Sequence, residues 1–218
     1  MSFNDVWHSE REEDWNRLLK NYWSLLSVAN IQVEYQLHRL SKTRISGMDA
    51  DSWYRFLHDE YFVWKYTAKN RLATTRASLR KMYERTGGAA DLERVRQAIV
   101  ELDTRDIGEA LRTACKIDGL GVAGASGLLS LIYPESFATV DQFVVKALLE
   151  VQERRDDVCH MRPENLTIKD GVVLTEMMRA KASSMNEVFR TTFWTPRTIE
   201  MALWAYRGTS SSEPDRCR

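Results

Sequence analysis

The chain has 218 residues, with equal numbers of acidic and basic side chains, 44% hydrophobic residues and 28% charged residues. These values are typical of a globular protein, and charged residues interrupt every apolar run well before the roughly 18 residues that a membrane span requires. With an acidic, polar N-terminal segment and no secretory h-region, the sequence favours a cytoplasmic protein with no membrane partner.

Apolar residues recur with a helical period and proline is rare, so the expected fold is all-α. A first helix is expected from about Glu10 into the thirties. A second helix, capped by Asp49 or Asp51, is expected to continue towards Tyr83 and to end at Gly87-Gly88. The later helices are expected over Asp91 to Glu101, Thr104 to Cys115 or Lys116, 122–132, Thr139 or Asp141 to Leu149, Val172 to Thr191, and from Thr195-Pro196 onward.

Two segments are expected outside helices. Residues 153–170 are predicted to be a charged loop that ends in a turn at Asp170-Gly171. The Ser-rich tail, 209–218, is predicted to be disordered. The three cysteines, Cys115, Cys159 and Cys217, lack CxxC spacing, which argues against a zinc site, an iron–sulfur cluster or a disulfide framework and favours isolated thiols.

The segment Gly119-Leu120-Gly121 predicts a sharp turn followed by a helix N-terminus. Backbone N–H groups at such a terminus bind a phosphate oxygen readily. Asp141 follows Gly121 by twenty residues, at the start of the next helix. A phosphate site with a carboxylate near it indicates chemistry on a nucleic-acid backbone or on its bases. The alternatives are that the glycines only end a helix and that Asp141 only caps one, although capping and catalysis can coexist.

Residues 65–96 contain nine basic and three acidic side chains. This imbalance predicts a basic surface suited to nucleic acid, although an ordinary solvated helix face explains it equally well.

The segment from about Leu111 to Leu149 resembles the helix-hairpin-helix (HhH-GPD) DNA glycosylase superfamily. Members share a GxG hairpin, a helix rich in small residues and a VD pair, which stand here as Gly119-Leu120-Gly121, 122–132 and Val140-Asp141. A weaker resemblance reaches back to 61–79, where members carry a helix that borders the base pocket.

This resemblance implies a two-lobed helical fold with the active-site cleft between the lobes. Residues 1–208 would form one unit, with the hairpin in a lobe of about 49–135 and the second lobe made of 1–48 plus 136–208. The implied function is excision of a damaged or modified base from DNA, which leaves an abasic site. A monomer is expected, with DNA as its partner and no iron–sulfur cluster.

Several roles follow from matching positions. Asp141 matches the catalytic aspartate. Ala123 stands where bifunctional members carry a nucleophilic lysine, so the resemblance implies a monofunctional enzyme that uses water and has no lyase activity. Lys146 matches a basic residue that is common in the family, and it is predicted to add a second phosphate contact. The predicted DNA-binding residues are Gly119, Leu120, Gly121, Ala123 and Lys146.

The resemblance also implies that a K⁺ or Na⁺ ion can lie between hairpin and phosphate. The backbone carbonyls of Cys115, Ile117 and Leu120 match those that hold it, and no other cofactor is required.

Trp64, Tyr66 and Trp194 are candidates for the wall of a base pocket, with core packing as the alternative for each. Asp59 and Glu60 lie near where some relatives carry a second acid. The sequence leaves the excised base open: oxidised or alkylated purines, mismatches and hypermodified bases of foreign DNA are all compatible with it.

Two other functions are compatible with the same residues. One is a non-catalytic DNA-binding protein that uses the hairpin alone, and the other is an interaction protein whose glycine turn is purely structural.

Overall fold

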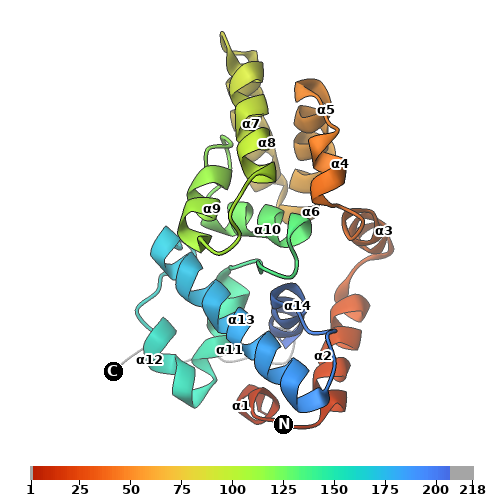
Figure 1. The fold of residues 1–218 in the computed structure, drawn as a ribbon, viewed down its shortest axis with the longest axis vertical. Coiled ribbons are helices and arrows are strands. Elements are labelled where there is room, and N and C mark those ends of the chain that lie inside the picture. Colours follow the sequence, from red (N-terminus) through yellow and green to blue (C-terminus); the bar gives the residue numbers. More distant parts are fainter. Residues whose placement is uncertain (1, 207–218) are drawn as a thin grey trace.

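The structure is a computed structural model that describes residues 2–206, and within this range it consists of helices and connecting loops with no strand (Figure 1). The all-α prediction is therefore confirmed. None of the helices in this range combines the length and the apolar run needed to cross a bilayer. The elements are α1 (Phe3–Trp7), α2 (Glu12–Leu25), α3 (Val28–Leu37), α4 (Lys42–Ser46), α5 (Ala50–Arg55), η1 (Phe56–Tyr61), α6 (Phe62–Lys65), α7 (Lys69–Glu84), α8 (Gly88–Val100), α9 (Ile107–Ala114), α10 (Val122–Ile132), α11 (Gln142–Leu149), η2 (Gln152–Arg154), α12 (Arg155–Val158), α13 (Ile168–Phe189) and α14 (Pro196–Tyr206).

Buried apolar side chains form two separate clusters. The first unites α1 and α2 with α11 to α14, in the lower half of Figure 1, where α2 packs along α14. The second unites α4 to α10 in the upper half, together with the end of α3. Leu37 and Ile45 belong to the second cluster, although the sequence-based division grouped residues 1–48 with the C-terminal helices. The chain therefore passes between the two clusters at the α2–α3 corner and again after α10.

The expected long first helix is wrong, because two helices occupy that segment. α2 ends at Leu25, and the Ser27 hydroxyl accepts a hydrogen bond from the Asn30 N–H at 3.2 Å. A serine that caps a new helix competes with continuation of the old one. The break lets α2 bury Trp15 in the first cluster while α3 buries Leu37 in the second.

The expected helix from Asp49 towards Tyr83 is also interrupted. Its middle section, η1, is a π-helix, and α6 ends before Tyr66, which has an extended backbone. A π-helix inserts an extra residue into a turn, which rotates the side chains that follow. Because Phe56 and Tyr61 in η1 are both buried, packing supports this irregular turn. As a result, Trp64 and Lys65 lie at the end of a short helix, beside a cavity.

Two predicted boundaries are also wrong. Asp106 rather than Thr104 caps α9, with the Asp106 Oδ1 accepting from the Glu109 N–H at 2.8 Å. Asp170 is not in a turn, because it completes a capping box with Thr167 that starts α13. The segment predicted as a charged loop also contains α12. The predicted disordered tail, 209–218, lies outside the described residues.

Candidate active site

The glycine hairpin connects α9 to α10, and its two glycines differ in what the backbone demands. Gly119 has a φ of 98°, and a β-carbon there would lie 2.9 Å from the Thr75 carbonyl oxygen. Only glycine fits that conformation and that approach without strain. Gly121 has a φ of −89°, and a β-carbon there would have no neighbour within 4 Å. The surface beside Gly121 is therefore open to close approach by a ligand.

The turn presents the start of α10 to solvent. The Gly121 carbonyl accepts from the Ala125 N–H at 2.8 Å, which is the first helical bond. Gly121 is exposed and Ala123 is partly exposed. N–H groups in the first turn have no partner within a helix, so this end can donate to an anion.

Tyr66 packs against the hairpin. A β-carbon on Gly124 would lie 2.5 Å from the Tyr66 hydroxyl oxygen, so this glycine makes room for the ring. Burial raises the pKa of Tyr66 and keeps its hydroxyl protonated. Tyr66 does not line the cavity beside Trp64. Its hydroxyl instead lies against the hairpin, 3.5 Å from the Gly119 carbonyl oxygen.

The carbonyls predicted to hold a monovalent cation belong to the same turn. The Ile117 carbonyl accepts from the Leu120 N–H at 3.0 Å, which uses part of its acceptor capacity. Cys115 is a free thiol.

Cys159 is disulfide-bonded, which corrects the expectation of an isolated thiol at that position. The spacing of cysteines along the chain does not predict a disulfide that depends on the fold.

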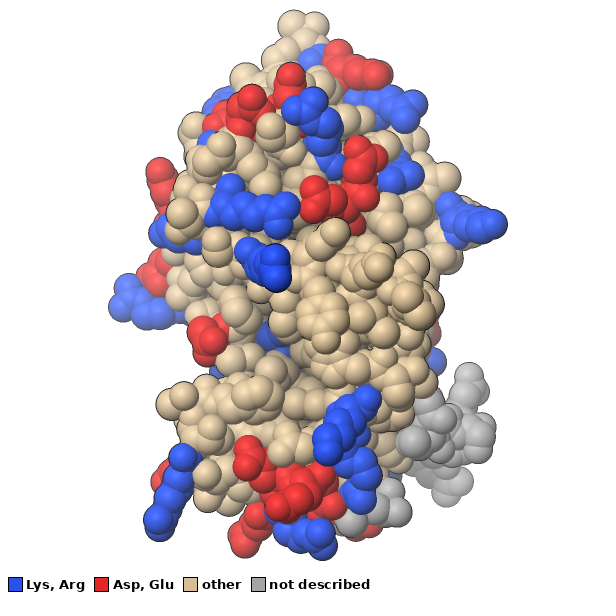
Figure 2. Space-filling model, turned by 90° about the vertical axis from the view of Figure 1, so that its right-hand side faces the viewer, with Lys and Arg blue, Asp and Glu red and all other residues tan. Residues whose placement is uncertain are grey.

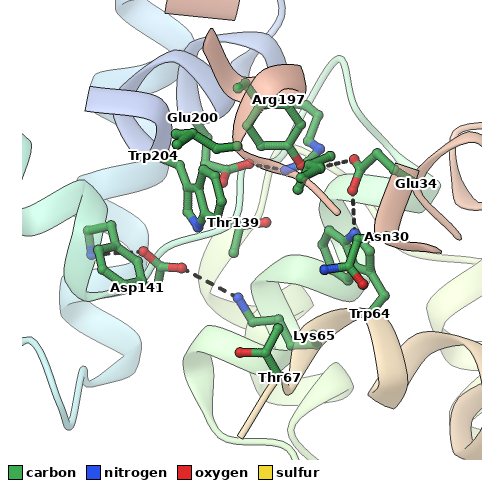
Figure 3. Close-up of a pocket in the computed structure, with 14 residues that line it drawn as sticks. Asn30, Glu34, Trp64, Lys65, Thr67, Thr139, Asp141, Arg197, Glu200 and Trp204 are labelled. Atoms are coloured by element: carbon green, nitrogen blue, oxygen red, sulfur yellow. Dashed lines mark hydrogen bonds and ion pairs between the residues drawn. The ribbon is translucent and has the colours of Figure 1, made fainter. Parts of the chain in front are cut away.

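A cavity of about 190 Å³ lies between the α2–α3 corner, the end of α6, the segment before α11, and α14 (Figure 3). Its walls contain groups from helices of both core clusters. The lining residues are Tyr22, Leu25, Leu26, Asn30, Glu34, Trp64, Lys65, Thr67, Thr139, Asp141, Phe143, Arg197, Glu200 and Trp204.

Asp141 both caps a helix and lines this cavity. Its Oδ1 accepts from the N–H groups of Phe143 at 2.9 Å and Val144 at 3.4 Å. Its Oδ2 lies 3.6 Å from the Nζ of Lys65, and 16% of the side chain is exposed. One oxygen thus holds the start of α11 while the other is directed to the cavity, so the two roles that the sequence left open are geometrically compatible.

Lys65 is a member of this site that sequence reasoning missed. It lies in the last turn of α6, and its side chain is 11% exposed. Figure 3 shows its amine directed towards the Asp141 carboxylate. The only sequence signal is its place at the start of the basic window of residues 65–96, for which the sequence predicts a surface charge. The pairing depends on how α6 ends, which the helical pattern does not reveal.

A buried charge cluster lies across the cavity from Asp141. The Nη2 of Arg197 lies 2.7 Å from Glu34 Oε1, and Arg197 also pairs with Glu200 on its own helix. All three side chains are at most 5% exposed. The Trp64 indole donates to Glu34, and its ring covers the Arg197 guanidinium at 5.3 Å. Nothing in the sequence pattern marked these charges as neighbours.

Burial raises the pKa of Glu200 to about 7, while the positive charge of Arg197 opposes the shift and the negative charge of Asp141 adds to it. The cavity walls carry three carboxyl groups, those of Glu34, Asp141 and Glu200, against the two cations Lys65 and Arg197. One excess negative charge in a buried cluster is costly, so a proton held by Glu200 near neutral pH removes the imbalance.

The other predicted site residues lie apart from the cavity. Trp194 is buried in the first core cluster, edge-on to Trp15 at 6.0 Å, so core packing explains it. Lys146 is exposed on α11. Asp59 and Glu60 pair with arginines outside the cavity. The aromatic rings that accompany Trp64 in the lining are instead Tyr22, Phe143 and Trp204.

The basic window of residues 65–96 does not form a uniform positive surface. Arg96 is buried and paired with Glu93, and Arg85 and Arg94 both pair with Asp91. Figure 2 shows the side of the molecule that carries α3, where charges of both signs are interspersed around a broad uncharged area.

Comparison with known proteins adds no assignment: no protein-family model, no curated protein and no solved structure matches the chain. The geometry of the cavity is therefore the basis for assigning a function.

Proposed function

We propose that this protein is a DNA glycosylase that hydrolyses the bond between deoxyribose and a damaged or modified base flipped out of the duplex. The observation that carries the proposal is the position of Asp141: its Oδ2 faces a cavity with aromatic walls, and it follows a glycine hairpin.

Cleavage of an N-glycosidic bond builds positive charge on the sugar as the base departs. A carboxylate held against the face of the sugar opposite the departing base stabilises the charge and can orient a water molecule, as in sugar hydrolases. Asp141 suits this role because two backbone N–H groups hold its Oδ1 and leave Oδ2 at the cavity. The aromatic lining, including Trp64 and Trp204, offers surfaces on which an extruded base can stack.

The DNA backbone would bind at the hairpin. N–H groups of Gly121 and Ala123 would donate to a phosphate oxygen, either directly or through a K⁺ or Na⁺ ion held by the turn carbonyls. Exposed Lys146 would contact a second phosphate. A two-lobed HhH-GPD arrangement, with the active-site cleft between lobes, is part of the proposal. It is supported by two core clusters whose helices both contribute to the cavity.

Base release measured by mass spectrometry tests the proposal. The protein is incubated with duplexes that carry oxidised, alkylated, deaminated or hypermodified bases and with genomic and phage DNA, and the free bases are identified. Asp141→Asn keeps a good N-cap while removing the negative charge, so we expect it to fold normally and to lose at least about a hundredfold in rate. The matched control is Asp106→Asn, at the N-cap of α9.

Release that is unchanged in Asp141→Asn would remove this aspartate from the mechanism. Salt-dependent duplex binding without release of any base would favour the non-catalytic helix-hairpin-helix protein instead. Absence of DNA binding at low salt would favour a structural role for the hairpin.

A further inference from the structure

We propose that the rings of Trp23 and Tyr35 form a stacking platform for an unpaired DNA base beside the target nucleotide, and that the substrate is therefore single-stranded or locally melted DNA. This inference rests on the proposed function, which it deepens by naming the substrate class. Base excision by itself requires only that the target base leaves the stack, whereas the platform holds a neighbouring base as well.

The surface that carries the platform is uncharged. Residues 21–38 contain no Lys or Arg and a single acidic side chain, Glu34, which is 1% exposed. The outer face of α3 presents Val28, Gln32 and Tyr35 at the spacing i, i+4, i+7, and Val28 and Tyr35 are 77% and 60% exposed. An exposed helix normally carries charged side chains on its outer face, but this side of the molecule shows a broad uncharged area (Figure 2). Such a surface suits flat, uncharged rings better than it suits phosphates.

The platform consists of two stacked rings. The ring centroids of Trp23 and Tyr35 lie 5.1 Å apart, with 20° between the ring planes. Trp23 is held from its edges by Tyr22 at 5.6 Å and His38 at 5.8 Å. It thus backs one face of Tyr35, whose 60% exposure leaves the other face open to solvent. A base can add to this stack as a third ring, because every nucleobase has a π face.

A continuous row of aromatic rings connects the platform to the cavity. Phe143, Trp204 and Tyr22 line the cavity, and the consecutive ring centroids lie 6.3 Å and 5.2 Å apart. Tyr22 then contacts Trp23, the inner ring of the platform. Only the Trp23 ring lies between Tyr22 and Tyr35 in this row. A base stacked on Tyr35 therefore belongs to a nucleotide close to the one whose base enters the cavity.

A base on this platform has left the duplex stack. Unstacking and unpairing a base costs free energy, and the cost is least for a base that is already unpaired. A single strand can occupy the platform without that cost, whereas a perfect duplex must open at a second position. The first cations on either side of the uncharged stretch, Lys20 and Arg39, are exposed and can contact the phosphates of such a strand.

The competing explanation is that this surface docks another protein, including a second copy of the chain. Two substitutions of Tyr35 separate the explanations. Tyr35→Phe keeps the flat ring, whereas Tyr35→Leu keeps a large apolar side chain without a ring. Base stacking predicts that only the phenylalanine variant retains binding, whereas an apolar docking surface tolerates leucine. Because Tyr35 is exposed, both variants should fold normally, which circular dichroism checks.

Fluorescence anisotropy with a labelled oligothymidine and with a duplex of the same length tests the inference. We expect the wild-type protein to bind the single strand more tightly than the duplex at equal salt. Tyr35→Leu should weaken single-strand binding by about five- to a hundredfold, the contribution of one stacked base, and should leave duplex binding unchanged. Tyr35→Phe should retain both affinities. The matched control is Phe193→Leu, which removes a ring of similar exposure, 52%, from the loop before α14.

Photocrosslinking locates the base. A single strand that carries 5-iodouracil forms a crosslink under ultraviolet light to an aromatic ring on which this base stacks. We expect peptide mapping to place the crosslink on Tyr35, and Phe193→Leu to crosslink as the wild-type protein does.

Three results would overturn the inference: duplex binding that is as tight as single-strand binding, full single-strand affinity in Tyr35→Leu, or a wild-type dimer that Tyr35→Leu dissociates in sedimentation. Base release from a perfect duplex together with any of these results would reject the platform and leave the glycosylase proposal intact. Single-strand binding that depends on Tyr35, without release of any base, would support the platform and count against the glycosylase proposal.

Discussion

Replacing Arg197 with methionine would remove the cation at the centre of the buried charge cluster. Methionine has a similar length and fills much of the same volume, so the principal change is the loss of charge and of the guanidinium donors. The two carboxylates that Arg197 holds, Glu34 and Glu200, would remain in place at exposures of 1% and 3%.

The expected loss is large because the partners are buried. Removing one member of a buried ion pair costs about 3–5 kcal/mol, since it leaves an uncompensated charge. For a chain of this size each kcal/mol lowers Tm by about 2–4 °C, so the expected shift is roughly 6–20 °C. Lys65 offers little compensation, because its ion-pair partner is Asp141.

The same reasoning predicts a dependence on pH. Two buried carboxylates without a cation escape the cost of a buried charge only when they are protonated. In the unfolded chain the same glutamate side chains have a pKa of about 4.3. The destabilisation should therefore be small near pH 5 and large near pH 8, as urea denaturation of both proteins at the two pH values would show. A variant that folds only at the lower pH would support the same pH dependence.

Arg44→Met is the matched control, since Arg44 pairs with Glu60 at 3.3 Å and both side chains are 40% exposed. An exposed pair contributes at most about 1 kcal/mol. If Arg197→Met costs no more than Arg44→Met, or if its cost is the same at both pH values, the cluster is not the buried, charge-balanced unit described above.

The remaining predictions concern Glu200 and the hairpin. Because the pKa of Glu200 is raised from 4.5 to about 7, its contribution to stability is fully present below pH 4.5 and is lost as the pH rises through about 7. Glu200→Gln should remove this loss. Urea denaturation should therefore show that the free energy of unfolding of the variant rises relative to that of the wild type between pH 4.5 and about 7; a constant difference would contradict the shifted pKa. Gly119→Ala should cost about 1–2 kcal/mol from its left-handed φ alone, and more from contact with the Thr75 carbonyl. Gly121→Ala should cost less than about 1 kcal/mol, and equal costs in thermal unfolding would count against the hairpin geometry.

Local signals in the sequence determined much of the helical framework. Asp141 starts α11 and Pro196 opens α14, because a side-chain acceptor and a fixed φ favour helix initiation wherever they occur. The left-handed Gly119 likewise follows from the absence of a β-carbon. These effects involve residues a few positions apart, so they can be inferred without knowing the fold.

Helix interruptions were harder to predict. The break at Ser27 and the π-helical turn before Lys65 occur inside segments with continuous helical periodicity. The break at Ser27 has a local cause, because the Ser27 hydroxyl caps α3. The π-helical turn is instead supported by the burial of Phe56 and Tyr61, and such packing outweighs the modest propensity of the local residues. The same limitation applies to Trp194, since an aromatic residue in a core and one in a pocket look alike in sequence.

The sequence by itself determined that the chain is helical, where a glycine hairpin lies and that the helix after α10 begins near Thr139 or Asp141; the structure assigns the cap to Asp141. Only the tertiary structure decided what faces that aspartate: the amine of Lys65, with which it pairs, and the Glu34–Arg197–Glu200 cluster across the cavity. The physical reason is the distance along the chain over which each interaction acts. Caps and turns depend on atoms within one helical turn, whereas the cavity brings together α3, α6, α11 and α14, whose relative positions depend on the packing of both clusters.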